Sequence, residues 1–353
     1  AYFSYRRDLP TLVSSAFHPL LGDRIHGPIG RMIDVLAIIA TLFGTATSLG
    51  LGAQQINSGM NYLWGTGESS TIALIIIGVL SVAFILSAVS GVGKGVQFLS
   101  NLNMVIALLL LLFLAAMGPT VFILDTLIEA MGYYFGDLVS MSFRTSAFSD
   151  SKWLASWTIF YWAWWISWAP FVGMFLARIS RGRTIKQFVI GVILVPTTVS
   201  LIWFVIFGGA GIGQQRDGID IFGEGEPEST LFGLLDHLPL AGVSSLLVMA
   251  LVAIFFVSGA DAASMVMGTL SQGGSLFPSR WAVAFWGLST GAVAVLMLWA
   301  GGNDALNGLQ TMTIIVAAPF VIVMIGMCVS LYLDVSRDPM VAHLRRTAPD
   351  RRK

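Results

Sequence analysis

The sequence predicts an all-α integral membrane protein made almost entirely of transmembrane helices. Hydrophobic residues make up 56% of its 353 residues and charged residues only 11%. A soluble domain of this size needs more charges to cover its surface. The apolar residues also come in runs of about 18 or more, the length that a helix needs to cross roughly 30 Å of hydrocarbon. The composition and the length of the apolar runs therefore both indicate a membrane protein.

Eight apolar runs follow one another along the chain, and an even number places both chain ends on one side of the bilayer. The segments on that side hold 16 of the 19 basic residues, and the other side holds Arg144, Lys152 and Arg216. Because cytoplasmic loops are enriched in Lys and Arg, we expect both ends in the cytoplasm of a multi-pass protein of the plasma (inner) membrane. The predicted spans are Met32–Leu51, Ile72–Val89, Met104–Ile123, Ala155–Leu176, Phe188–Phe207, Ala241–Gly268, Ala282–Ala300 and Met312–Leu333.

The stretch Thr126–Arg144, on the outer side between the third and fourth spans, has a different pattern. Apolar residues recur near helical spacing and are interrupted by Glu129 and Asp137. This pattern predicts an amphipathic helix at the outer interface. An ordered extracellular loop is the alternative.

The fourth span is rich in tryptophan, with six of the eleven tryptophans between Trp153 and Trp168. Interfacial anchoring accounts for tryptophans at the ends of a span but not for those near its middle. On a helix, steps of four and three line up one continuous aromatic stripe. Its members are Trp157, Tyr161, Trp164, Trp168, Phe171 and Phe175.

An aromatic stripe inside a membrane suits a cation that has no N–H donors. A quaternary ammonium group binds through aromatic faces, at roughly 2 kcal/mol for each desolvated contact. The alternative is an aromatic helix that simply packs against its neighbours. Pro170 loosens the helix just below the tryptophans and favours a binding site.

The first and sixth spans are rich in small and hydroxyl residues. Gly44, Ser48 and Gly52 follow each other at four-residue spacing, which usually lets helices approach closely. Hydroxyl and backbone oxygens of this kind are also suitable ligands for a sodium ion. Asp261, an ionisable residue in the sixth span, is expected to be functional and to pair with Arg178 or Lys94.

Several other classes of function are not supported. The four histidines have no metal-ligand spacing, so we expect no metal other than sodium. No nucleophile lies beside a base in the pattern of a catalytic site, so we expect no enzyme, no cofactor and no nucleic-acid partner. The single cysteine, Cys328, cannot form an intrachain disulfide.

The tryptophan-rich span and the Leu176–Arg183 stretch that follows it resemble the betaine/choline/carnitine transporter family, most closely its sodium-coupled glycine betaine symporters. Further matching stretches are Gly44–Gly52, Ser90–Gly95, Leu99–Met104 and Ala260–Ser264. The likeness covers essentially the whole chain.

The resemblance implies a LeuT-like fold of two inverted five-helix repeats around a site at the membrane midplane. It implies that this chain is an incomplete version that begins after the family's fourth helix and would not transport alone. Residues 32–125 would then be the last three helices of the first repeat and 126–150 the outer amphipathic helix. Residues 151–333 would be the second repeat and 334–353 a basic cytoplasmic tail.

The resemblance also implies roles for individual residues. Trp165 would help to cage the quaternary ammonium, and Trp164, Trp168, Phe160 and Phe175 would line the pathway and gate it. One sodium site would use Thr41, Thr45 and Phe171, and the other Phe255, Ser258 and Gly259. The family's sodium-coupled symporters have a hydroxyl residue where this chain has Gly259. This difference is an argument against sodium coupling at that position.

These implications lead to an expected function, which is sodium-driven uptake of a trimethylammonium osmolyte, glycine betaine foremost. One alternative is a sodium-independent carnitine or choline exchanger. Another is a membrane sensor that binds the same cation without moving it. The outer helix resembles the element through which family members pack, so a homotrimer is expected.

Overall fold

The computed structural model describes residues 1–90, 93–148, 151–222, 227–301 and 305–339. These residues form helices and turns, without a strand among them. Eight of the described helical segments are long and apolar enough to cross a membrane, as the sequence predicts. They are α3 (Pro28–Trp64), α4 (Ser70–Ser90), α5 (Gly93–Met117), the segment Ser151–Ile179, α9 (Ile185–Arg216), α11 (Ala241–Ser271), α12 (Arg280–Gly301) and α13 (Ala305–Arg337).

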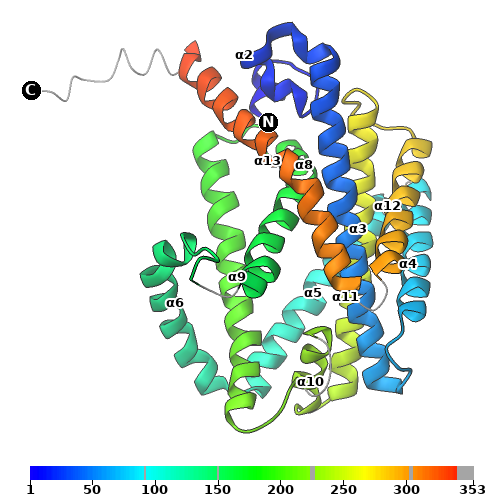
Figure 1. Cartoon of the computed structure of the whole chain (residues 1–353), viewed down its shortest axis with the longest axis vertical. Helices are drawn as coiled ribbons and strands as arrows, with labels where there is room; N and C mark the ends of the chain where they lie inside the picture. The colour runs from blue at the N-terminus through cyan, green and yellow to red at the C-terminus, as the bar shows by residue number, and fades with distance from the viewer. Residues whose placement is uncertain (91–92, 149–150, 223–226, 302–304, 340–353) are drawn as a thin grey trace, which may run out of the picture.

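Helix α3 lies at the centre of the bundle and packs against α4, α8 (Phe160–Ile179), α11, α12 and α13 (Figure 1). Its glycines make these close approaches possible. A Cβ on Gly44 would lie 2.2 Å from the hydroxyl of Ser167, and one on Gly52 would lie 1.6 Å from the ring of Phe256. The spacing of small residues in the first span therefore marks tight helix contacts.

The fourth span is built from three consecutive helical segments. They are α7 (Ser151–Trp153), a π-helical turn, η3 (Leu154–Ile159), and α8. A π turn rotates the side chains that follow it relative to an unbroken α-helix, and such turns are frequent at functional sites. Pro170 lies inside α8, as the sequence indicates.

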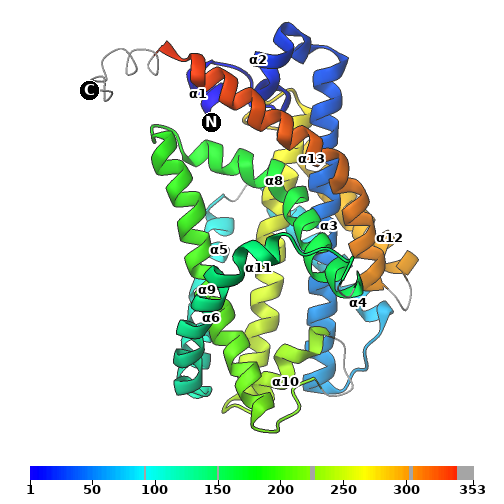
Figure 2. The same cartoon turned by 60° about the vertical axis from the view of Figure 1, so that its left-hand side comes forward.

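The stretch predicted as an amphipathic helix is helical, so the alternative of a loop is wrong. Helix α6 (Thr120–Ser142) packs mainly against α9 (Figure 2). It is not itself one of the eight candidate spans. The predicted boundary is also wrong, since α5 ends at Met117 and α6 begins six residues before Thr126. Pro119 causes this break, because proline has no N–H to donate and disfavours helical backbone in the residue before it.

Both ends of the described chain lie at the same end of the bundle (Figure 1). Before α3 the chain forms α1 (Tyr2–Arg6), η1 (Ser14–Phe17), α2 (His18–Leu21) and η2 (Gly22–His26). The phenol of Tyr2 donates a hydrogen bond to Asp338, just beyond α13, at 2.9 Å. Burial and this hydrogen bond raise the pKa of Tyr2 above its ordinary value. The shared side of the two ends is therefore confirmed.

The opposite end carries η4 (Pro227–Ser229) and α10 (Thr230–Asp236). Most of the predicted basic tail, residues 340–353, lies outside the described residues.

Candidate functional site

The aromatic stripe of the fourth span forms a continuous ladder of ring contacts. Trp157 stacks on Tyr161 with centroids 5.6 Å apart, and Tyr161 meets Trp164 edge-on at 5.9 Å. Trp168 follows at 6.5 Å from Trp164, and Phe171 at 5.7 Å from Trp168. The helical spacing of these residues thus predicts their contacts correctly. We call these five residues the aromatic ladder.

Two indole N–H groups tie the ladder to α3. Trp164 donates from Nε1 to the hydroxyl of Ser48 at 3.0 Å, and Trp168 donates to the carbonyl of Gly44 at 3.2 Å. The Ser48 hydroxyl in turn donates to the Gly44 carbonyl. Ser48 is thus a site residue, although the sequence pattern identifies it only as one of the small residues that let helices approach closely. Its four-residue spacing from Gly44 is the sequence feature that places both residues on the face that meets the ladder.

A small cavity of about 10 Å³ lies where α3, α8 and α11 meet. This is near the lower limit for one water molecule. Three of the predicted sodium-site residues and one predicted pathway residue share its wall, although they come from three different helices. The lining residues are Thr45, Ser48, Leu49, Trp168, Phe255, Phe256, Gly259 and Ala260.

The first set of proposed sodium ligands is buried beside the ladder. The hydroxyl of Thr41 donates to the carbonyl of Ala37 at 2.8 Å, and that of Thr45 donates to the carbonyl of Thr41 at 2.7 Å. Each hydroxyl donates its proton to a backbone carbonyl of its own helix, so its oxygen lone pairs remain available to a cation. Phe171 belongs to the same buried cluster as Ala37.

The second set lies on α11. The hydroxyl of Ser258 donates back to the carbonyls of Ile254 and Phe255, at 2.9 and 3.1 Å. Phe255 is half-exposed, and a Cβ on Gly259 would meet nothing within 4 Å. The packing therefore does not require glycine at position 259.

The remaining predicted residues lie apart from the cavity. Phe160 is buried and stacks on Trp164 at 5.7 Å. Trp165 is 69% exposed, so it faces away from the contacts that its neighbour Trp164 makes. Phe175 is also exposed and lies beyond the end of the ladder. The described helices bring Trp164, Trp168 and Phe160 together, but not Trp165 or Phe175.

The expected ion pair of Asp261 with Arg178 is wrong. Asp261 accepts a hydrogen bond from the hydroxyl of Ser87 on α4 at 3.3 Å, and no ion pair joins it to Arg178. The side chain of Lys94 lies outside the described residues. Helix α11 packs more closely with α4 than with α8, and this packing selects the partner.

Comparison with known proteins gives the family. The sequence profile of BCCT, the betaine/carnitine/choline family transporter, matches residues 1–340. The chain is 46% identical to the glycine betaine transporter OpuD of Bacillus subtilis, over 96% of this chain and 66% of that protein. It is 44% identical to the betaine/ectoine transporter LcoP of Corynebacterium glutamicum, over 98% of this chain and 55% of that protein.

A probable glycine betaine transporter of Desulfitobacterium hafniense is 42% identical, over 96% of this chain and 68% of that protein. The chain thus spans between about half and two thirds of the length of these relatives, all of which are named as transporters and none as an enzyme. The family profile matches nearly the whole chain, and several members are 42–46% identical to it. This multi-pass membrane protein belongs to the betaine/carnitine/choline transporter family.

Proposed function

We propose that the protein takes up a trimethylammonium osmolyte, glycine betaine foremost, by secondary active transport coupled to sodium. The observation that carries the proposal is the cavity between α3, α8 and α11. Trp168, Thr45 and Gly259 all line it. An aromatic residue of the kind that binds an organic cation thus lies beside residues that carry oxygen atoms of the kind that bind a metal cation.

The names of the relatives support the substrate class, since they are called glycine betaine or betaine/ectoine transporters. In this proposal Trp165 would contact the quaternary ammonium group, and Trp164, Trp168, Phe160 and Phe175 would border the route to it.

Coupling needs a sodium ion to be bound together with the substrate. Thr41, Thr45 and Phe171 would form one site, and Phe255, Ser258 and Gly259 the other. The two threonine hydroxyls retain lone pairs, and Ser258 does so too. Gly259 offers only its backbone carbonyl, which specifically favours the second candidate function, a sodium-independent carnitine or choline exchanger.

The proposal places the protein in the plasma (inner) membrane, with both ends in the cytoplasm, as a homotrimer. The basic side chains Arg6, Arg7, Arg178 and Arg181 gather at the end where the two termini meet, which supports a cytoplasmic location for that end. Helix α6 exposes large apolar side chains, such as Phe135 and Val139, that a neighbouring copy would cover.

The test is uptake of radiolabelled glycine betaine into proteoliposomes that contain the protein at its native length, with and without an inward sodium gradient. Trp165→Ala should reduce affinity about 2- to 5-fold, the equivalent of one exposed cation–π contact of about 0.5–1 kcal/mol. Trp162→Ala is the matched control, because Trp162 lies on the same helix and is 68% exposed.

Each outcome selects one function. Sodium-dependent uptake that Trp165→Ala impairs and Trp162→Ala spares supports the proposal. Uptake that is the same with and without the sodium gradient supports the sodium-independent exchanger instead. Binding of betaine without uptake selects the membrane sensor, and neither binding nor uptake of any trimethylammonium compound contradicts the substrate class.

A further inference from the structure

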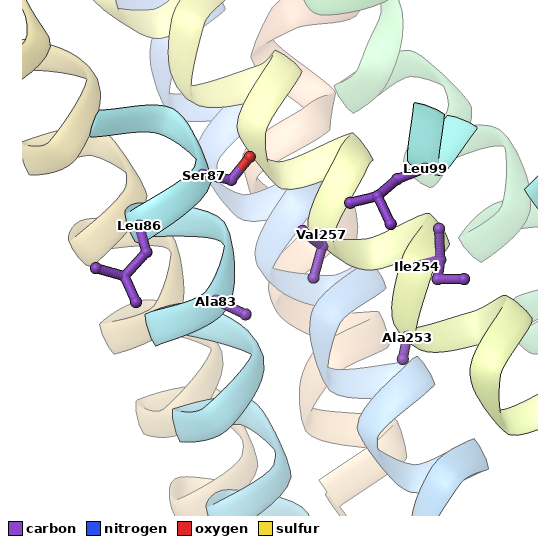
Figure 3. A pocket seen from close by; sticks show the side chains of 7 residues that line it. All are labelled: Ala83, Leu86, Ser87, Leu99, Ala253, Ile254 and Val257. Atoms are coloured by element: carbon purple, nitrogen blue, oxygen red, sulfur yellow. The ribbon is translucent and has the colours of Figure 1, made fainter. Parts of the chain in front are cut away.

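A pocket of about 530 Å³ lies between α4, α5 and α11, apart from the small cavity described above (Figure 3). Helices α4 and α5 both pack against α11, but their described residues make no comparable contact with each other. The gap between them is the pocket. Its lining residues are Ala83, Leu86, Ser87, Leu99, Ala253, Ile254 and Val257.

The walls of this pocket are almost entirely aliphatic. Ser87 is the one lining residue with a polar side chain, and its hydroxyl turns towards α11, where it donates a hydrogen bond to Asp261 at 3.3 Å (Figure 3). A buried water molecule needs about two to four polar partners, whereas an apolar cavity of about 150 Å³ stays dry and takes up benzene. A larger pocket with aliphatic walls therefore suits a hydrocarbon ligand.

The depth of the pocket in the membrane narrows the kind of hydrocarbon. Ala253 and Val257 lie 12 and 16 residues after the start of α11 at Ala241, and 18 and 14 residues before its end at Ser271. At about 1.5 Å per residue, both are roughly 20–25 Å from either end of the helix. The hydrocarbon core of a bilayer is about 30 Å thick, so the acyl chains of its two leaflets end near its middle. The pocket thus lies at the depth of their methyl ends.

The pocket also adjoins the surface that this membrane protein exposes to lipid. On α4 the exposed side chains of Ile75, Val79, Val82 and Leu86 recur in steps of four and three and form one stripe. Leu86 belongs both to this stripe and to the wall of the pocket. Phe98 on α5 is exposed as well, next to a lining residue of its helix. An acyl chain that lies along the stripe can therefore enter the pocket without leaving an apolar environment.

We propose that this pocket binds an acyl chain of a membrane phospholipid, with the methyl end of the chain beside Ala83 and Ala253. These two small side chains, one on α4 and one on α11, leave the space that the chain occupies. Phe256 and Gly259 of α11 line the cavity of the candidate site. The bound chain thus packs against a helix that also forms a wall of that cavity. The site depends on the membrane location of the protein and not on the proposed transport function.

The test is photo-crosslinking in vesicles of a phosphatidylcholine that carries a diazirine near the methyl end of one acyl chain, with the protein at its native length. Light converts the diazirine into a carbene, which releases N₂ and inserts into a nearby C–H bond. Mass spectrometry of the peptides should find adducts on both walls, at Ala83 and at Ala253. The same lipid with the diazirine beside the ester group should not label them, because that group stays at the edge of the hydrocarbon core.

Ala253→Phe should lower the yield of adducts at Ala83 several-fold, because the phenyl ring occupies the space of the chain. Val82→Phe is the matched control, because Val82 is 58% exposed on α4 and does not line the pocket. Should Ala253→Phe fail to fold, Ala83→Phe on the opposite wall decides through the adducts at Ala253.

Two results would overturn the proposal. Adducts on the exposed stripe of α4 but not in the pocket would mean that another segment of the native-length protein fills it. Pocket adducts whose yield is unchanged by a phenylalanine in the wall would mean that the label reaches these residues without a bound chain.

Discussion

The indole N–H groups of the ladder illustrate how single residues hold this site in place. Trp164 and Trp168 each direct one donor to α3, where the acceptors are a hydroxyl and a carbonyl. A buried indole needs such a partner, because an unpaired N–H in an apolar region is costly. The hydrogen bonds therefore set the rotation of the rings about α8.

Trp164→Phe should lower the free energy of unfolding by about 1 kcal/mol, the usual contribution of one hydrogen bond. The phenyl ring can still stack on Phe160, and Ser48 keeps its bond to Gly44. Thermal unfolding in detergent measures the change. Trp162→Phe is the control on the exposed side of the same helix. Equal losses in the two variants would mean that the bond to Ser48 does not contribute.

Gly259→Ser should not destabilise the protein and could add up to about 0.5 kcal/mol, because glycine is the poorest non-proline residue in a helix interior. The new hydroxyl would enter open space beside the cavity. If sodium binds there, betaine binding should become more dependent on sodium than on potassium, as measured by tryptophan fluorescence.

Gly291→Ser is the matched control, because a Cβ there would lie 2.4 Å from the hydroxyl of Ser81 and should destabilise α12. A sodium response that is unchanged in Gly259→Ser would argue against a sodium site at this position.

At the scale of elements, the seam between α3 and α8 depends on the missing side chain at Gly44. The two helices approach so closely that Ser167 occupies the place of a Cβ. This contact brings Trp168 within reach of the Gly44 carbonyl. The seam therefore positions the ladder.

Gly44→Ala should cost roughly 1–3 kcal/mol, the typical penalty for overpacking. Ser167→Gly in the same chain should restore much of the loss, since it frees the space that the new Cβ needs. Thermal unfolding of the single and double variants measures both effects. Gly173→Ala on α8, where a Cβ meets nothing within 4 Å, serves as the control. A double variant no more stable than Gly44→Ala would contradict this account of the seam.

At the scale of the whole molecule, the segment before α3 fastens the two ends of the chain together. Arg6 makes a bidentate ion pair with Asp338, and Arg7 makes one with Asp334. The hydroxyl of Ser330 also donates to the carbonyl of Ala16. The start of the chain thus rests on α13, far away in sequence.

Arg6→Gln combined with Arg7→Gln should speed hydrogen exchange over residues 1–17 by a few-fold. Exposed ion pairs contribute little to stability, and bidentate geometry is the arrangement in which they contribute most. Mass spectrometry of the exchange measures the effect. Arg24→Gln is the control at an exposed arginine of the same segment. Unchanged exchange in the double variant would show that the apolar contacts of this segment suffice.

The orientation in the membrane can be tested by labelling. In a Cys328→Ser background, Asp217→Cys should react with a membrane-impermeant maleimide in intact cells. Arg183→Cys should react only after the cells are permeabilised, because its loop belongs to the basic side. The reverse pattern would invert the proposed topology.

Sequence patterns alone predict the membrane class, the eight spans, the shared side of the two ends and the contacts within the aromatic ladder. These features depend on composition and on the helical repeat, which act locally along the chain. The proline at position 119 also indicates the break between α5 and α6, although the predicted span runs past it to Ile123.

Which faces of the helices meet is visible only in the folded molecule. It joined Trp164 to Ser48, gathered Thr45, Trp168 and Gly259 around one cavity, and gave Asp261 the partner Ser87 in place of Arg178. The sequence does not reveal these contacts because spans in lipid are apolar on nearly every face. No polar side marks the surface that packs, so small residues and individual hydrogen bonds between distant helices select it.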